Sequence, residues 1–139
     1  AKLSQALMSI GAVKGVEIGD GFQVSHTKGS ENNDSFYMDN GKICKRTNHS
    51  GGVLGGLSDG SRIVLRAAIK PTPSISQEQD TVDAYGGETR IAITGRHDPV
   101  IVPRAVVVVE AMAAITAVDL LLANMGAKLE YLEKVYNRN

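Results

Sequence analysis

A short proline-containing segment carries residue types that suit phosphate binding. Residues 70–74 read Lys70-Pro71-Thr72-Pro73-Ser74, which places one ammonium and two hydroxyl groups on a backbone that two prolines restrict. An ammonium and hydroxyls are good hydrogen-bond donors to phosphate oxygens. A rigid turn at the end of an edge strand would use the same residues, so the sequence leaves both interpretations open.

A second segment combines a guanidinium group with two groups that can carry protons. Arg96, His97 and Asp98 are consecutive and precede Pro99. Arginine can hold a carboxylate or a phosphate through two hydrogen bonds, and Asp and His side chains can take up or donate protons. Taken alone, this short run favours a surface ion pair before a proline turn.

A third segment is rich in glycine. Residues 50–60 read SGGVLGGLSDG, and glycines in such a cluster allow positive φ angles or a close approach of the backbone to a ligand. The order is neither a dinucleotide-binding fingerprint nor a P-loop, because Ser61 and Arg62 follow where a P-loop has Lys and Ser or Thr. By itself the cluster favours a flexible turn over a phosphate cradle.

Helices and short strands must position these segments. Apolar residues spaced as on one helix face predict a first helix that ends near Gly11, and the long apolar run predicts a helix over 103–123. Alternating apolar residues predict a strand over 62–70, with Arg62, Arg66 and Lys70 on its other face. Further predicted elements are strands at 13–18, 36–38, 42–45 and 90–94, a polar connection over 77–87 and a short helix over 128–136.

Composition excludes several classes of protein. The 139 residues hold 15 basic and 15 acidic side chains, so no global charge favours a nucleic acid or an anionic membrane. The single cysteine, Cys44, excludes an internal disulfide framework and fits a reducing, cytoplasmic setting. We therefore expect no nucleic-acid partner, no membrane partner and no metal site.

The long apolar helix is predicted to be covered by protein rather than by lipid. Arg104, Glu110 and Asp119 fall on different sides of it, and each charge near the centre of a membrane helix costs about 2.5–3.5 kcal/mol. None of its sides is broadly polar, so we expect protein on all sides. The first residues already follow a helical pattern without a signal segment, which predicts a fragment of a longer protein.

Five blocks in one order resemble the C-terminal part of the chorismate synthase family. These are GVEIGDGF at 15–22, NHSGGVLGGLSDG at 48–60, KPTPSI at 70–75, GRHDP at 95–99, and Pro103-Arg104-Ala105 continued by Glu110-Ala111-Met112. The resemblance spans nearly the whole chain and about the last third of a family member. It implies a single C-terminal portion over residues 1–139, without the portion that carries the family's two catalytic histidines.

The resemblance implies a reaction and a cofactor. The family converts 5-enolpyruvylshikimate 3-phosphate to chorismate by 1,4-elimination of phosphate, and it needs reduced FMN, with NADPH as a candidate reductant. Arg96 is implied to lie between flavin and substrate, and Asp98 to take part in proton transfer. The implied FMN-binding residues are Gly11, Ala12, Gly55, Lys70, Pro71, Thr72, Pro73, Ser74 and Arg96. Many relatives carry Asn where Gly11 stands, so only a backbone contact is implied there.

The resemblance also implies a fold and an assembly. The fold class is α+β, part of a β-α-β sandwich in which antiparallel sheet packs on buried long helices, and the assembly is a homotetramer. We expect the chain alone to be inactive. Two other interpretations remain: a stand-alone anion- or nucleotide-binding module, and an interaction domain that binds only a missing half.

Overall fold

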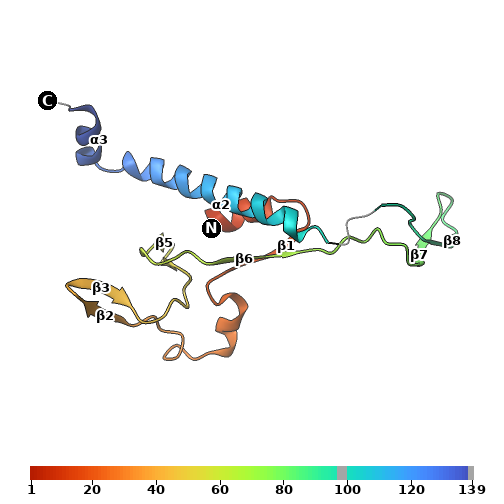
Figure 1. Ribbon diagram of the computed structural model, residues 1–139, viewed down its shortest axis with the longest axis horizontal. Coiled ribbons are helices and arrows are strands. Elements are labelled where there is room, and N and C mark those ends of the chain that lie inside the picture. Colours follow the sequence, from red (N-terminus) through yellow and green to blue (C-terminus); the bar gives the residue numbers. More distant parts are fainter. Residues whose placement is uncertain (97–99, 138–139) are drawn as a thin grey trace.

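The computed structural model describes residues 1–96 and 100–137, which form helices and small antiparallel sheets (Figure 1). This confirms the α+β class. The described helices are α1 (Lys2–Met8), α2 (Val102–Met125), α3 (Leu129–Tyr136) and the 3-10 helix η1 (Gly21–His26). The described strands are β1 (Val13–Ile18), β2 (Phe36–Asp39), β3 (Lys42–Lys45), β4 (Val53–Leu54), β5 (Leu57–Ser58), β6 (Leu65–Ile69), β7 (Gln79–Val82) and β8 (Glu88–Ile91).

The pair β1 and β6 joins distant parts of the sequence. The two strands are antiparallel, with Val13 opposite Ile69 and Ile18 opposite Leu65, and an irregularity at Lys14. Leu65, Ala67 and Ile69 are half-buried while the residues between them are exposed, which confirms the predicted alternation. The strand begins at Leu65 rather than at 62, because the Val64 N–H donates to the Gly51 carbonyl in the glycine-rich segment instead of to β1.

The other three sheets are hairpins: β2 with β3, β4 with β5, and β7 with β8. The prediction of a polar connection over 77–87 was wrong, because these residues form β7 and the turn into β8. The side chain of Asp83 closes that turn by accepting hydrogen bonds from the backbone N–H groups of Tyr85 and Gly87, both at 2.8 Å. The glycine cluster likewise contains the short strands β4 and β5, which the sequence did not predict.

The core of the described chain is small. Leu7 on α1 and Val13 on β1 are the buried apolar side chains, at 0% and 4% exposure. α1 packs on one side of α2, where Ala105, Val109, Met112, Ala113 and Thr116 are half-buried.

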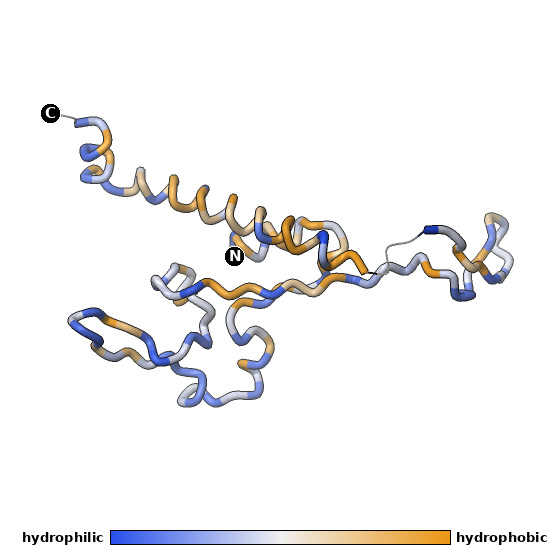
Figure 2. The backbone as a smooth tube through the Cα atoms, in the orientation of Figure 1, coloured by the Kyte–Doolittle hydropathy of each residue, from blue (hydrophilic) through white to orange (hydrophobic). Residues whose placement is uncertain are grey.

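The expectation that α2 is covered on all sides is not met within this chain. No described residue of α2 is buried, because α1 is short and covers one side only. Apolar residues follow α2 along its length (Figure 2). α2 has a mean hydropathy of 2.2 over its most apolar part. By length and composition alone it could cross a membrane, but core helices of soluble proteins also meet this criterion. A compact protein of 14.7 kDa exposes about 6,900 Å², whereas this chain exposes 11110 Å².

Candidate functional site

The segment that begins at Lys70 is fixed at several points along its backbone. The Lys70 N–H donates to the Ala12 carbonyl at 2.8 Å, directly after the β1–β6 pairing. Gln79 Nε2 donates to the Pro73 carbonyl at 3.0 Å. The Ile93 N–H donates to the Ile75 carbonyl at 3.2 Å, which brings the residues before Arg96 alongside this segment. The structure therefore bonds Ala12 to the first residue of segment 70–74, and bonds the stretch that leads to Arg96 to Ile75, directly after its last residue.

Ala12 has an unusual backbone conformation at its contact with Lys70. Its φ is 68°, in the left-handed region that residues with a Cβ rarely adopt. The N–H of the next residue, Val13, donates to the Ile10 carbonyl at 3.2 Å as the chain leaves α1. The Ala12 carbonyl is thereby directed to Lys70. Backbone strain of this kind is often found at ligand sites. The space beside the neighbouring Gly11 is open, because a methyl group added to Gly11 would meet nothing within 4 Å.

The donor set of the site fits a phosphate group. Lys70 and Arg96 are exposed, and Thr72 and Ser74 are half-buried. Among the residues that the structure describes, these four side chains make no hydrogen bond or ion pair with one another or with their surroundings. The ammonium and two hydroxyls of the 70–74 segment are donors of the kind that a flavin phosphate would need, and the Arg96 guanidinium could hold a further anion.

Gly55 lies away from the contact between Ala12 and Lys70. It forms the turn between β4 and β5 together with Gly56, with φ angles of 58° and 85°. This hairpin joins the chain ahead of β6, whereas Lys70 follows β6, so the two lie at opposite ends of that strand (Figure 1). Nothing lies within 4 Å of either glycine's missing side chain. Asp98 lies outside the described residues.

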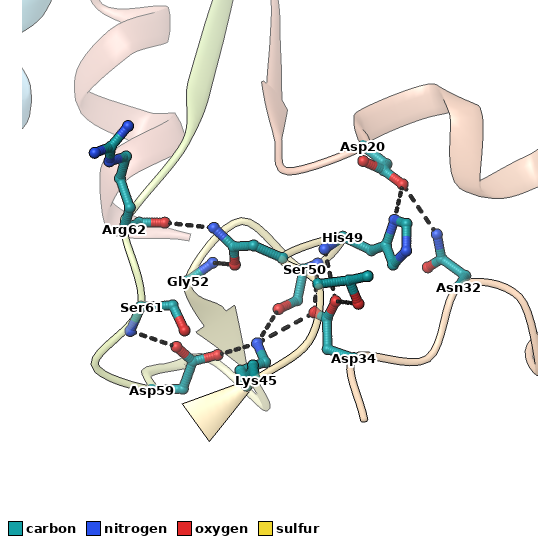
Figure 3. Close-up of polar contacts among 12 residues, drawn as sticks. Asp20, Asn32, Asp34, Lys45, His49, Ser50, Gly52, Asp59, Ser61 and Arg62 are labelled. Carbon is teal, nitrogen blue, oxygen red and sulfur yellow. Dashed lines mark hydrogen bonds and ion pairs between the residues drawn. The ribbon is translucent and has the colours of Figure 1, made fainter. Parts of the chain in front are cut away.

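A network of nearly buried charges at the base of the glycine hairpin was not predicted (Figure 3). Lys45 Nζ contacts Asp59 Oδ2 at 2.7 Å and Asp34 Oδ2 at 3.1 Å, and it donates to Ser50 Oγ at 3.0 Å. The three charged side chains are 7%, 8% and 11% exposed for Lys45, Asp34 and Asp59. One feature of the sequence could have indicated the place of Asp59 in this network: Asp59-Gly60-Ser61 has the residue types of a turn. In the structure the Ser61 N–H donates to Asp59 Oδ1 at 2.8 Å.

The charges of this network are stabilised by their partners. Burial opposes ionisation of Asp34, but the N–H of Ser50, the hydroxyls of Thr47 and Ser50 and the N–H of His49 together hold the pKa of Asp34 well below its ordinary value. The hydrogen bond to Asp59 raises the pKa of Lys45. The same bond from Lys45, followed by bonds from Ser61, lowers the pKa of Asp59.

His49 has a structural partner. Its Nδ1 lies 2.6 Å from Asp20 Oδ2, and Asn32 Nδ2 donates to the same oxygen at 3.2 Å (Figure 3). The Asp20 N–H also donates to the His49 carbonyl at 2.9 Å. These bonds join the start of η1 to the residues before the glycine segment, so His49 has a role in holding the fold.

Comparison with known proteins gives one family throughout. The model of the chorismate synthase family matches residues 1–122. A chorismate synthase of Lachnoclostridium phytofermentans is 63% identical over 139 residues, which are 99% of this chain and 38% of that protein. A chorismate synthase of Archaeoglobus fulgidus is 58% identical over 123 residues, 88% of this chain and 34% of that protein.

A crystal structure of a chorismate synthase is similar in fold, with a TM-score of 0.70 and 35% identity over 98% of this chain and 34% of the other. The chain thus spans little more than a third of the length of the relatives it matches. Because the family match covers residues 1–122, this chain belongs to the chorismate synthase family.

Proposed function

We propose that this chain is the C-terminal portion, residues 1–139, of an enzyme that makes chorismate from 5-enolpyruvylshikimate 3-phosphate, and that it holds the phosphate end of reduced FMN. One observation carries the proposal. The backbone of the 70–74 segment is fixed by Ala12 at Lys70 and by Gln79 at Pro73, while its donor side chains and that of Arg96 have no protein partners among the described residues. The family match over residues 1–122 supports the assignment of these segments to a chorismate-forming enzyme.

Each residue of this segment has a distinct task. The Lys70 ammonium and the Thr72 and Ser74 hydroxyls donate to phosphate oxygens, and Pro71 and Pro73 limit the entropy lost on binding. Gly11 and Ala12 offer backbone groups, since the first has no side chain and the second has a left-handed φ. Gly55 offers its backbone from the tip of the β4–β5 hairpin, where no side chain blocks approach.

The chemical step breaks the carbon–oxygen bond to phosphate and a ring carbon–hydrogen bond, without net redox change. Reduced FMN, when bound, supplies electron density to the substrate as phosphate leaves. Arg96 stabilises negative charge between flavin and substrate. The carboxylate of Asp98 takes up a proton during the elimination. NADPH is a candidate for keeping the flavin reduced.

The exposed apolar surface of α2 fits an enzyme in which other protein covers it. We propose that the remainder of a homotetrameric, cytoplasmic enzyme packs on α2 in a β-α-β sandwich, and that α2 does not enter a membrane. Most of α2 lies inside the family match, and Arg104, Glu110 and Asp119 are spread along it. The chain alone lacks a complete, water-excluding site, so we expect no turnover from it.

The test uses a full-length chimera: the L. phytofermentans relative with its matching segment replaced by this chain. We expect the chimera to form chorismate with reduced FMN. Lys70→Ala should weaken FMN binding about tenfold to a hundredfold, since a charge-assisted hydrogen bond contributes about 1.5–3 kcal/mol. Flavin fluorescence titration measures this affinity.

Arg62→Ala is the matched control, because within the described part of the chain Arg62 bonds through its backbone carbonyl alone, which accepts from Asn48 Nδ2 at 2.8 Å. Equal losses from the two substitutions would show that the face of the strand with Arg62, Arg66 and Lys70, rather than the 70–74 segment, holds the phosphate. A chimera that binds no FMN would overturn the proposed function itself.

A further inference from the structure

The hairpin that carries Gly55 is too short to hold its own shape. Its ladder consists of two residue pairs, Val53 with Ser58 and Leu54 with Leu57. Isolated two-stranded hairpins are marginally stable in water even when they are longer. Its tip is also exposed, with Leu54 at 54% and Leu57 at 75%. Order at the tip must therefore come from the base.

One ammonium group joins the two ends of this hairpin. Ser50 lies before β4 and Asp59 lies after β5, and Lys45 Nζ bonds to both, at 3.0 Å and 2.7 Å. Asp34, from the preceding loop, anchors the ammonium from a third direction at 3.1 Å. Figure 3 shows the three acceptors converging on Lys45 between the two chain ends.

Further hydrogen bonds close the same base. Asn48 Oδ1 accepts from the Gly52 N–H while Asn48 Nδ2 donates to the Arg62 carbonyl, both at 2.8 Å. The Asp59 N–H donates to the Gly52 carbonyl at 3.1 Å. The carboxylate of Asp34 also binds the N–H groups of His49 and Ser50, at 2.7 Å and 2.9 Å. The polar contacts of the hairpin are thus concentrated at its base.

Fold stability alone is a poor reason for such an arrangement. Burying an ion pair costs desolvation energy, and apolar residues of similar size often stabilise a protein as well or better. An ion network instead favours one conformation over alternatives, because any conformation that breaks a contact leaves a buried charge without its partner. Here that geometry sets the separation of the hairpin's two ends, and so the direction of its tip.

We propose that Lys45 is a positioning residue that holds residues 50–59 closed, so that the Gly55 backbone is presented to the flavin. The proposal rests on the proposed function, because the contact between Gly55 and FMN belongs to it. Lys45 itself touches neither cofactor nor substrate. Its effect reaches the site through Ser50 and Asp59.

The experiment compares Lys45→Met with Lys42→Met and Lys45→Arg in the full-length chimera. Lys42 is an exposed lysine of the same strand, and arginine can restore contacts to both carboxylates. We expect Lys45→Met to weaken FMN binding about 10- to 100-fold, as misplaced positioning groups do, with turnover largely recovered at saturating FMN. Lys42→Met should leave the affinity unchanged, and Lys45→Arg should restore most of it.

Two further measurements keep the outcome decisive. If Lys45→Met does not fold, Asp59→Asn loosens only the far end of the hairpin and leaves Lys45 with Asp34; its FMN affinity should fall in the same direction. Hydrogen exchange should show faster exchange of the 51–59 amides in either variant, with or without flavin.

Unchanged FMN affinity or unchanged amide exchange in a folded Lys45→Met or Asp59→Asn variant would overturn the proposal. Equal losses from Lys42→Met would do the same. If the unsubstituted chimera binds no FMN, the proposed function fails, and the amide exchange still decides whether Lys45 orders the hairpin.

Discussion

Lys45 and Lys70 occupy opposite electrostatic settings, although both stand at the end of a short strand. Lys45 is nearly buried and satisfied by two carboxylates and a hydroxyl. Lys70 is exposed, and within the described residues its ammonium has no protein partner. The first lysine can only shape the protein, whereas the second can bind a ligand. Sequence alone does not separate them, because the carboxylates that hold Lys45, those of Asp34 and Asp59, lie far from it along the chain in polar loops.

Asp98 can be tested as a proton carrier, although it lies outside the described residues. Asp98→Asn keeps the shape and hydrogen-bonding capacity of the side chain but removes its basicity. In the full-length chimera we expect near-normal FMN affinity and a kcat lower by about 10²- to 10⁴-fold, the usual span for losing general acid–base help. Flavin Kd and single-turnover rate, measured on the same variant, separate chemistry from binding.

Asp39→Asn is a suitable control, because Asp39 is exposed at the turn between β2 and β3. If Asp98 only orients Arg96 or closes the turn before Pro99, affinity should fall together with rate. A near-normal rate at saturating ligands would remove Asp98 from the chemistry.

Elements whose signals are local could be predicted from the sequence. The alternation in β6, the periodicity of α1 and the long apolar run of α2 are local patterns of the chain. The Asp39-Asn40-Gly41 turn between β2 and β3 uses typical turn residues, with Asn40 at a φ of 46°. β7 was missed because its residues are mostly polar and exposed, and its hairpin depends on Asp83. β4 and β5 were missed because their order comes from Lys45 and Asn48 outside them.

The candidate site was predictable in part. The 70–74 segment and Arg96 stood out by residue type, and the structure bonds Lys70 to Ala12 and bonds Ile93, in the stretch leading to Arg96, to Ile75. The left-handed φ of Ala12 carries no sequence signal, because alanine rarely adopts it. The contact of Ala12 with Lys70 could not be predicted either, since it depends on long-range pairing of β1 with β6.

Two glycines, Gly19 and Gly51, allow two stretches of backbone to pass very close to each other. One stretch leads from β1 into η1, and the other is the start of the glycine segment. Gly19 has a φ of 59°, and a methyl group there would overlap the His49 carbonyl oxygen. Gly19→Ala should therefore destabilise the full-length chimera by about 2 kcal/mol or more, from the left-handed backbone and the overlap together. Urea unfolding measures the change.

Gly29→Ala provides the control for this close approach. Gly29 has no left-handed φ and nothing within 4 Å of the added methyl, so we expect a change within about 0.5 kcal/mol. A similarly small effect of Gly19→Ala would mean that the two stretches can shift apart without cost.

The whole molecule exposes more surface than its mass requires. Its 11110 Å² exceed the value of about 6,900 Å² for a compact chain of this size, and α2 contributes apolar area to the excess. Val107, Ile115 and Leu121 on α2 are 65%, 64% and 60% exposed. Such a surface is typical of a face that other protein covers.

We therefore expect the purified chain on its own to self-associate and to bind a hydrophobic dye. Sedimentation velocity and dye fluorescence at several concentrations are the measurements. A stable monomer at all concentrations, without dye binding, would show that the apolar face of α2 needs no cover.

Fragment complementation tests most directly the claim that this chain supplies one part of a composite flavin site. The chain is produced together with the portion of the L. phytofermentans relative that it does not match, and chorismate formation is measured with reduced FMN. We predict turnover when both parts are present, none from either part alone, and a higher FMN requirement when the chain carries Lys70→Ala. Turnover by this chain alone, or equal turnover by the other portion without it, would contradict the claim.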